Sequence, residues 1–436
     1  MPSDARRVAL EVVRRTFEQG AYSDRAFQGA AHDLARRDRA LAMRLAYGTV
    51  QRRATLDYLI ECCAERPVAK LDPLVRGALR LGAYELCFTQ DAQHAAVNDT
   101  VELARESRGQ ALVNAVLRRL ARERTQLLAA LDDSTPAGAA TLHSVPPWIA
   151  EEWFESLGAD GARALLSRCN EPAEHALRAN TLVTDAADLA AALDVRTTLP
   201  GDPPEAVVVR EQFDAHGSPL WRDGQFMPQS RASMLSAHAL DPQPGERVLD
   251  MCAAPGAKTT HIAALMRDSG AITAIERHPA RAATLRATIA RMKVHIADVQ
   301  VADVGELTPK GPQFDRVLLD APCSGLGTIH SRPDLRWRVS PDALRVLARE
   351  QARLLSAAAL ATAPGGTLVY STCTISAAEN ERQIGAFLGE RHQFQAIDLE
   401  PRFPAWRHPR GAGQLLALPH VQGSDGFFVA ALRRQG

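Results

Sequence analysis

Residues 247–259, "RVLDMCAAPGAKT", decide the fold of the C-terminal half of this chain. The run "RVLDMCAA" predicts a buried strand, and a helical pattern begins at 257. Pro255 and Gly256 lie in the short turn between them, where the backbone can come close to a ligand at the N-terminus of the helix. A strand, a tight turn and a helix in this order are typical of the first unit of a doubly wound α/β sheet.

The same alternation continues toward the C-terminus. Four further strands are predicted in "AITAIE", "HIADVQVAD", "FDRVLLDAP" and "GGTLVYSTCT", with helices between them at 278–292, 341–362 and 377–389. Right-handed crossovers between such strands give a doubly wound, mostly parallel sheet. We expect this Rossmann-like domain at 236–436, preceded by a small α/β subdomain at 146–235 in which "HALRANTL" and "EAVVVRE" are strands.

The first 132 residues predict helices alone. Apolar residues recur at three- and four-residue spacing, with breaks near Gly20, Pro67, Asp91 and Gly109. Residues 133–145, "DSTPAGAATLHSV", have the composition of a linker.

The composition bounds the class of protein. A chain of 436 residues, 46% hydrophobic and 23% charged, is typical of a soluble protein with two or three domains. Its net charge of zero argues against a strongly basic coat for nucleic acid, and no apolar run is long enough to cross a membrane. The N-terminus shows no secretory signal, and the seven scattered cysteines form no CxxC pair, so we expect neither disulfides nor a zinc site and place the protein in a reducing cytoplasm.

Four predicted strands end in carboxylates, which are Asp250, Glu276, Asp303 and Asp320. Ligands of such sheets bind outside the carboxyl ends of the strands. The first loop lacks both the Walker A and the GxGxxG patterns, while an acid after the second strand suits a ribose with free hydroxyls. These features favour S-adenosylmethionine, with Asp303 near the adenine and Asp250 or Asp320 near the methionine amine.

The predicted cofactor site is a loop together with three carboxylates. Its residues are Cys252, Ala253, Ala254, Pro255, Gly256, Ala257, Lys258, Glu276, Asp303 and Asp320.

Two cysteines, Cys323 and Cys373, end the fourth and fifth strands and should face one crevice. A cysteine in this position can be a nucleophile, a metal ligand or a small core residue. A thiolate is a good nucleophile where nearby positive charge lowers its pKa. A metal would need more ligands than these two, so we expect none. The remaining cysteines, apart from Cys252 in the loop, lie in helical patterns and are expected in the core.

At this point the motifs "CAAPGAKTTHIAAL", "LLDAPCSGLGTIHSRPDLRW", "GGTLVYSTCTISAAENE" and "DGFFVAAL" resemble those of the NOL/NOP2/Sun family of RNA (cytosine-5) methyltransferases. The resemblance extends from about residue 145 to the C-terminus. The helical segment 1–132 resembles a NusB-like RNA-binding domain. This combination is similar to the bacterial family members that methylate 16S rRNA, which implies that 16S rRNA is the partner. We expect the enzyme to be a monomer that binds neither a membrane nor a metal ion.

The resemblance also implies roles for four residues. Cys373 of the TCT motif would attack carbon 6 of cytosine, and Cys323 of the PCSG motif would assist proton removal and product release. Asp320 would hydrogen-bond the base, and Lys258 would help to position the cofactor, the base or Asp320. A tRNA substrate and a non-catalytic role in RNA binding or ribosome assembly stay open as alternatives.

The sequence departs from the family pattern in places. Ala257 replaces the second glycine of the usual APGGK loop; alanine costs stability there if the position needs a positive φ and is harmless if it begins the helix. Glu276 stands where aspartate is common, and Ser230 replaces an acid. The run 330–338, "HSRPDLRWR", is expected either to contact RNA or to form a solvated loop with surface ion pairs.

Overall fold

The computed structural model describes residues 3–89, 93–105, 107–306, 313–411 and 413–436, without the side chains of 93–96 and 306. The predicted break at Asp91 lies outside these residues. The chain forms two compact units: residues 1–171 together with 329–338, and residues 172–328 together with 339–436. None of the described helices has the length and apolar character needed to cross a membrane.

The first unit is helical, as predicted. Its helices are α1 (Asp4–Glu18), α2 (Ser23–Ala30), α3 (Arg36–Gln51), α4 (Arg53–Ala64), α5 (Pro73–Phe88), α6 (Gln93–Leu103), α7 (Gln110–Ala129), α8 (Pro136–His143), α9 (Pro147–Arg168) and α15 (Leu335–Arg338), with a 3₁₀ turn η1 (Val68–Lys70). Gly20 follows α1 with a φ of 65°, Pro67 precedes η1, and Gly109 precedes α7, so three of the predicted breaks are confirmed. The predicted linker instead contains α8, which begins where Thr135 accepts a hydrogen bond from the Gly138 N–H.

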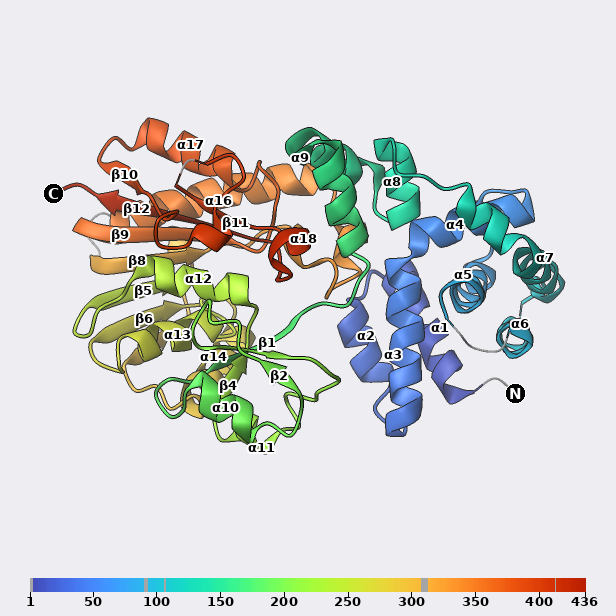
Figure 1. Cartoon of the computed structure of the whole chain (residues 1–436), viewed down its shortest axis with the longest axis horizontal. Coiled ribbons are helices and arrows are strands. Elements are labelled where there is room, and N and C mark those ends of the chain that lie inside the picture. Colours follow the sequence, from blue (N-terminus) through green and yellow to red (C-terminus); the bar gives the residue numbers. More distant parts are fainter. Residues whose placement is uncertain (1–2, 90–92, 106, 307–312, 412) are drawn as a thin grey trace. The chain divides into compact units, whose positions relative to one another are not determined.

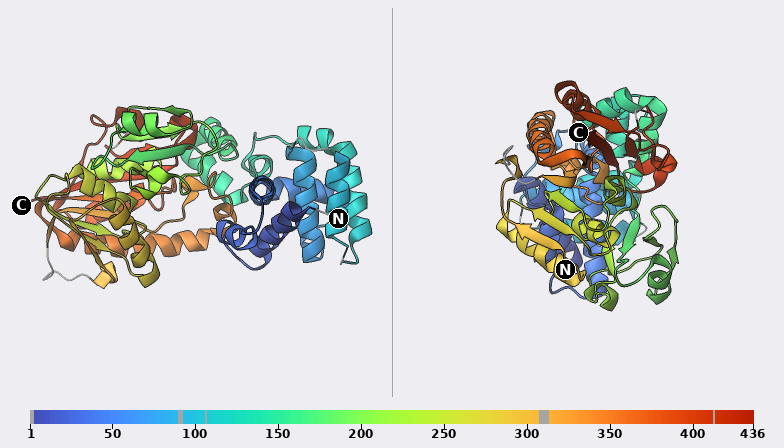
Figure 2. Two further views of the ribbon diagram at one scale, coloured as in Figure 1. Left: turned by 90° about the horizontal axis from the view of Figure 1, so that it is seen from below. Right: turned by 90° about the vertical axis from the view of Figure 1, so that its left-hand side faces the viewer.

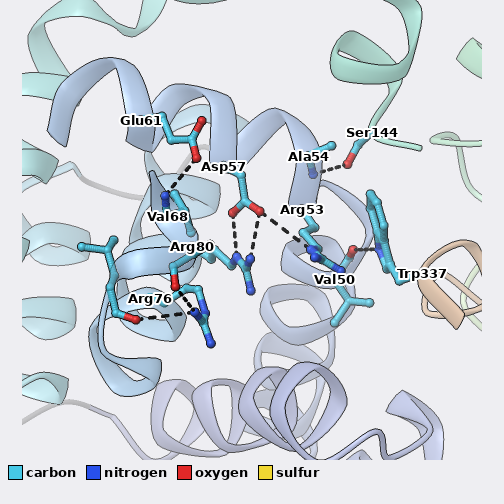
Figure 3. A network of polar contacts seen from close by, with 12 residues as sticks. Val50, Arg53, Ala54, Asp57, Glu61, Val68, Arg76, Arg80, Ser144 and Trp337 are labelled. Carbon is cyan, nitrogen blue, oxygen red and sulfur yellow. Dashed lines mark hydrogen bonds and ion pairs between the residues drawn. The ribbon is translucent and has the colours of Figure 1, made fainter. Parts of the chain in front are cut away.

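Residues 329–338 belong to this helical unit although they follow the PCSG motif in the sequence. The side chain of Arg336 is fully buried and donates to the carbonyl oxygens of Ser144 at 3.0 Å and Cys169 at 3.1 Å. These two residues follow the last turns of α8 and α9, where carbonyls lack partners within the helix and attract positive charge. Trp337 donates from Nε1 to the Val50 carbonyl in α3 at 2.7 Å (Figure 3).

The expectation that this run is an RNA contact or a solvated loop is therefore wrong for Arg336. Asp334 is also buried, and it accepts a hydrogen bond from the Ser23 hydroxyl at 2.8 Å. The sequence shows the charges of this run but not the helix ends that they meet.

The second unit contains two sheets. The smaller is antiparallel, in the order β2-β3-β1-β4, with core residues such as Leu177 and Phe226. Its elements are β1 (His175–Ala179), α10 (Ala186–Ala192), β2 (Thr197–Thr198), β3 (Ala206–Val209), α11 (Pro219–Arg222) and β4 (Phe226–Pro228).

The larger sheet has the order β10-β12-β9-β8-β5-β6-β7, with β11 paired to β12. The five strands from β9 to β7 are parallel, while β10, β11 and β12 pair antiparallel. Helices cover both faces, with α12, α13 and α14 on one and α16 and α17 on the other (Figure 1 and Figure 2). The predicted fold class, a Rossmann-like sheet after a small α/β subdomain and a helical domain, is confirmed.

The elements of this larger sheet are, in chain order, α12 (Arg231–Leu240), β5 (Arg247–Met251), α13 (Ala257–Leu265), β6 (Ala271–Ile275), α14 (Pro279–Arg291), β7 (Ala297–Gln300), η2 (Val304–Glu306), β8 (Phe314–Asp320), η3 (Leu326–Thr328), α16 (Pro341–Ala361), β9 (Thr362–Thr372), α17 (Glu381–Glu390), β10 (Phe394–Ile397), η4 (Pro404–Trp406), β11 (Leu415–Ala417), α18 (Pro419–Gln422) and β12 (Phe427–Arg434).

Replacing Arg336 with leucine should lower the free energy of unfolding of the helical unit by about 3 kcal/mol, because buried carbonyls lose a charged donor. Urea-induced unfolding measures the change. Arg332 is exposed in the same segment, so Arg332→Leu is the matched control and should change stability by less than about 0.5 kcal/mol. Equal effects of the two substitutions would contradict the structural role of Arg336.

Candidate active site

The carboxyl ends of the parallel strands bring the predicted acidic residues to one edge of the sheet. Asp250 is the next-to-last residue of β5, Asp320 is the last residue of β8, and Glu276 directly follows β6. Burial, together with the charges of Asp320, Asp250 and Glu276, raises the pKa of the Cys252 thiol to about 12. The three carboxylates therefore lie near Cys252, the first residue of the loop.

Asp303 lies three residues beyond β7 and is half-exposed. Its Oδ1 accepts hydrogen bonds from the Gly305 N–H at 2.8 Å and from Arg353 of α16 at 3.1 Å. The backbone hydrogen bond and the arginine hold the pKa of this carboxyl below its usual value. Asp303 thus lies at the predicted edge, already paired with a neighbouring helix.

The two cysteines meet in the structure. Their strands β8 and β9 are neighbours, with Asp320 opposite Ser371, and the Sγ atoms of Cys323 and Cys373 are 3.3 Å apart. The hydrogen bond with Cys323 lowers the pKa of Cys373, and the charge of Lys258 acts in the same direction. The same hydrogen bond, with burial, raises the pKa of Cys323 well above its usual value. Cys373 is therefore the thiol of the pair that ionises first.

Asp320 and Lys258 form an ion pair beside the thiols. Lys258 Nζ is 2.7 Å from Asp320 Oδ2 and 5.2 Å from the centre of the Phe427 ring. Burial alone would lower the pKa of Lys258, but the Asp320 carboxylate outweighs burial and raises it, so the amine is charged. Ser371 donates from its hydroxyl to Asp320 Oδ1 at 2.9 Å, which fixes the second carboxylate oxygen. Sequence reasoning missed Ser371, although its place opposite Asp320 follows once the two strands are paired.

The loop 252–257 takes the conformation that its sequence allows. Gly256 has a φ of 106°, and a Cβ atom added there would lie 2.9 Å from Leu285 Cδ1. Helix α13 begins at the next residue, Ala257, so the alanine that replaces the family's second glycine has helical geometry and carries no strain. Of the two alternatives for Ala257, the structure shows the second: the residue begins the helix, so the alanine does not cost stability. Ser230, another departure from the family pattern, precedes α12, where its carbonyl accepts from the Ser233 N–H at 3.0 Å.

A buried arginine supports the start of α13. Arg178 of β1 is fully buried and donates to the Ala257 carbonyl at 2.6 Å and to the Thr260 hydroxyl at 2.9 Å. Its third partner is Gln229 Oε1 at 3.1 Å. The small sheet therefore holds the helix that carries Lys258. The sequence predicted only a strand at "HALRAN", because nothing in that run reveals its partners.

A second buried cluster joins the small sheet to α12 and α13. Among the described residues, Glu205, His238 and His261 are the one group with donor atoms close enough to hold a metal ion. Nε2 of His238 is hydrogen-bonded to Glu205 Oε1 at 2.9 Å, while Nε2 of His261 lies 2.7 Å from the same oxygen without the geometry of a hydrogen bond. Burial and the nearby Arg178 lower the pKa of His261 to about 3. A positive charge so close opposes a bound cation, and we interpret the cluster as structural.

The fold is a Rossmann-like sheet with paired thiols and carboxylates along its carboxyl edge, and the comparisons with known proteins identify the class as an RNA methyltransferase. Residues 237–433 match the family described as 16S rRNA methyltransferase RsmB/F, and residues 3–122 match the NusB family. The chain belongs to the RsmB/F family of methyltransferases.

Relatives and solved structures agree with this assignment. A probable ribosomal RNA small subunit methyltransferase B from Bacillus subtilis is 35% identical, covering 100% of this chain and 99% of its own length. The protein of the same name from Synechocystis is 37% identical, covering 99% of each chain. The solved structure of PH0851 is 27% identical with a TM-score of 0.80, covering 100% of this chain and 99% of that one. A methyltransferase homologue from Pyrococcus horikoshii is 28% identical with a TM-score of 0.61, over 69% of this chain and 99% of that one.

Gly256→Ala should destabilise the protein by about 2 kcal/mol, because it forces a side chain into the left-handed region against Leu285. The neighbouring change Ala257→Gly should cost about 1 kcal/mol or less, since the residue is already helical. Urea-induced unfolding of the two variants provides the comparison. An equal loss in both would mean that the loop does not require its glycine.

Proposed function

We propose that this protein transfers a methyl group from S-adenosylmethionine to carbon 5 of a cytidine in 16S rRNA, through a covalent adduct with Cys373. One observation carries the proposal: two thiols 3.3 Å apart, with unequal acidity, lie beside a lysine–aspartate pair at the carboxyl edge of the sheet. The substrate follows from the relatives, which are named as small-subunit rRNA methyltransferases over nearly the whole chain.

The cofactor fits the residues at this edge. Asp250 is fully buried, its Oδ2 accepts from the Thr259 hydroxyl at 2.6 Å, and its Oδ1 has no partner in the described structure. A buried oxygen without a donor suits the amine of the methionine moiety. Glu276 would hold the ribose hydroxyls, Asp303 would lie near the adenine, and the 252–257 backbone would approach the remaining part of the cofactor. When bound, the sulfonium supplies an electrophilic methyl group.

The residues of the site account for formation of the adduct. The Cys373 thiolate attacks carbon 6 of the base, the 5,6 double bond opens, and its electron pair makes carbon 5 nucleophilic. The Asp320 carboxylate would accept a hydrogen bond from the exocyclic amine, and a second one from N3 once attack on the ring has made N3 basic enough to be protonated, which stabilises the charge that develops in the ring. Lys258 keeps Asp320 oriented through the 2.7 Å ion pair. The target base must leave its stack to reach these groups.

Cys323 acts after methylation. Its proton is held mainly by the hydrogen bond to Cys373. Once Cys373 is a thioether, it no longer carries the thiolate charge that holds the proton on Cys323. Cys323 can then give up its own proton to solvent, and its thiolate takes the proton from carbon 5. The pair of electrons released restores the 5,6 double bond and expels the Cys373 thiolate, so the product leaves.

Cys373→Ala should abolish methyl transfer, because no other group takes the place of the nucleophile. Cys323→Ala should still form the bond to the base and accumulate a covalent protein–RNA adduct. Methyl transfer from labelled cofactor and denaturing gels with mass spectrometry report the two outcomes. Full activity of the Cys373→Ala protein would contradict the mechanism.

Cofactor affinity should rise with pH. Burial raises the pKa of Asp250 to about 7, so below that pH the carboxyl is protonated and must lose a proton to pair with an amine. The dissociation constant should fall by up to about tenfold per unit as pH rises toward 7, and level off above it. Calorimetry from pH 6 to 8 measures this trend. Asp250→Asn should remove it, and a pH-independent affinity in the native protein would argue against the amine contact.

Mapping of 5-methylcytosine in rRNA and tRNA from a deletion strain, with and without the gene restored, tests the substrate. Loss of one methylcytosine in 16S rRNA, with recovery on restoration, is the expected outcome. A loss confined to tRNA would replace the proposed substrate with the alternative one.

A further inference from the structure

Two adjacent residues, Glu379 and Asn380, lie directly before helix α17 and are fully buried. Neither is a member of the site described above. Every side-chain hydrogen bond recorded for this dipeptide leads to a residue beside one of the two cysteines or to Gln351, which itself contacts the Cys323 loop.

Glu379 holds the loop of Cys323. Its Oε1 accepts from the Ser324 N–H at 2.9 Å, and its Oε2 accepts from the Ser324 hydroxyl. Oε1 also accepts from Gln351 Nε2 at 2.9 Å, and the same nitrogen donates to the Pro322 carbonyl at 2.9 Å. The residues on both sides of Cys323 are thus fixed through one buried carboxylate. All of its partners are donors, so only a group with two acceptor oxygens satisfies them.

Asn380 holds the loop of Cys373 in place through its side-chain amide. Its Oδ1 accepts from the Thr372 hydroxyl at 2.6 Å, and its Nδ2 donates to the Thr374 carbonyl at 2.9 Å. One amide therefore binds both neighbours of the cysteine, using an acceptor on one side and a donor on the other. An amide is the group that offers both.

The two loops are also joined to each other. The hydroxyls of Ser324 and Thr374 are 2.8 Å apart, and the Tyr370 hydroxyl donates to the Glu379 carbonyl at 2.6 Å. These contacts make one hydrogen-bonded frame around the thiols. The 3.3 Å separation of the Sγ atoms is set by this frame as well as by the pairing of β8 with β9.

We propose that Glu379 and Asn380 are positioning residues for two different steps, Glu379 for product release through Cys323 and Asn380 for adduct formation by Cys373. This inference rests on the proposed function. According to it, Glu379 and Asn380 together fix the position of Cys373 relative to Cys323. Each of the two residues affects a different step of the reaction.

The test uses the full-length protein with 16S rRNA and S-adenosylmethionine, and measures both methylated product and covalent adduct. Glu379→Gln puts an amide nitrogen where an acceptor is needed, so product formation should fall about tenfold while the ratio of adduct to product rises about tenfold. Asn380→Asp removes the donor to Thr374, so adduct and product should fall together, with their ratio unchanged. Glu390→Gln, an exposed position at the far end of α17, is the matched control and should alter neither quantity.

For Glu379, the ratio distinguishes positioning from general destabilisation, which lowers adduct and product in parallel. For Asn380, whose expected loss is also parallel, the alkylation rate of Cys373 described below makes this distinction. A parallel loss in Glu379→Gln would overturn its assignment to release, and a raised ratio in Asn380→Asp would overturn the assignment of Asn380. Ser324→Ala, which keeps the backbone N–H bond to Glu379, is a milder variant should Glu379→Gln fail to fold. It should raise the ratio in the same direction, and an unchanged ratio would count against the frame.

A readout without RNA separates this inference from the proposed function. The rate of Cys373 alkylation by iodoacetamide at pH 8, followed by peptide mass spectrometry, should fall at least about threefold in Asn380→Asp and stay at the native rate in Glu390→Gln. An unchanged rate in Asn380→Asp would overturn the role of Asn380. Cys373→Ala and Cys323→Ala in the RNA assay report on the mechanism itself: were Cys373→Ala active, the proposed function would fail while the alkylation result stood.

Discussion

The parallel pairing of β8 with β9 is the constraint on which the site depends. Leu319 lies opposite Tyr370 and Asp320 opposite Ser371, and the apolar side chains of this pair are fully buried. A slip of one residue would turn those side chains to the other face of the sheet and would separate Asp320 from Ser371. With the register set, the loops that follow each strand bring Cys323 to Cys373, and the Ser371 hydroxyl meets Asp320.

The chemistry of the pair follows from this contact. The hydrogen bond between the two thiols, whose Sγ atoms are 3.3 Å apart, lowers the pKa of Cys373, and the nearby lysine favours the anion on Cys373 as well. Lys258 itself lies on α13, whose first turn is held by the buried Arg178 of the small sheet. The small sheet therefore contributes to the site although none of its residues belongs to the predicted reaction centre.

The helical unit depends on residues that the sequence places in the catalytic half. Arg336 satisfies carbonyls at the ends of α8 and α9, and Trp337 donates to α3. Within the same unit, Asp57 accepts two hydrogen bonds from Arg80, at 2.7 and 2.8 Å, and Ala54 donates to the Ser144 hydroxyl (Figure 3). Arginine is abundant throughout this chain, and the arginines named here donate hydrogen bonds to the ends of helices and pair with a half-buried acid.

The sequence by itself determined the fold class, the strand ends and the candidate residues, because hydrophobic periodicity and the glycine and proline turns are local properties. It also placed both cysteines at the ends of neighbouring strands, since strand order in such sheets is restricted. Only the tertiary structure decided which thiol is the more acidic, what Arg336 contacts and how Glu379 and Asn380 are used. These depend on distances between residues far apart in the chain, and a buried hydrogen bond leaves no pattern in the sequence of either partner.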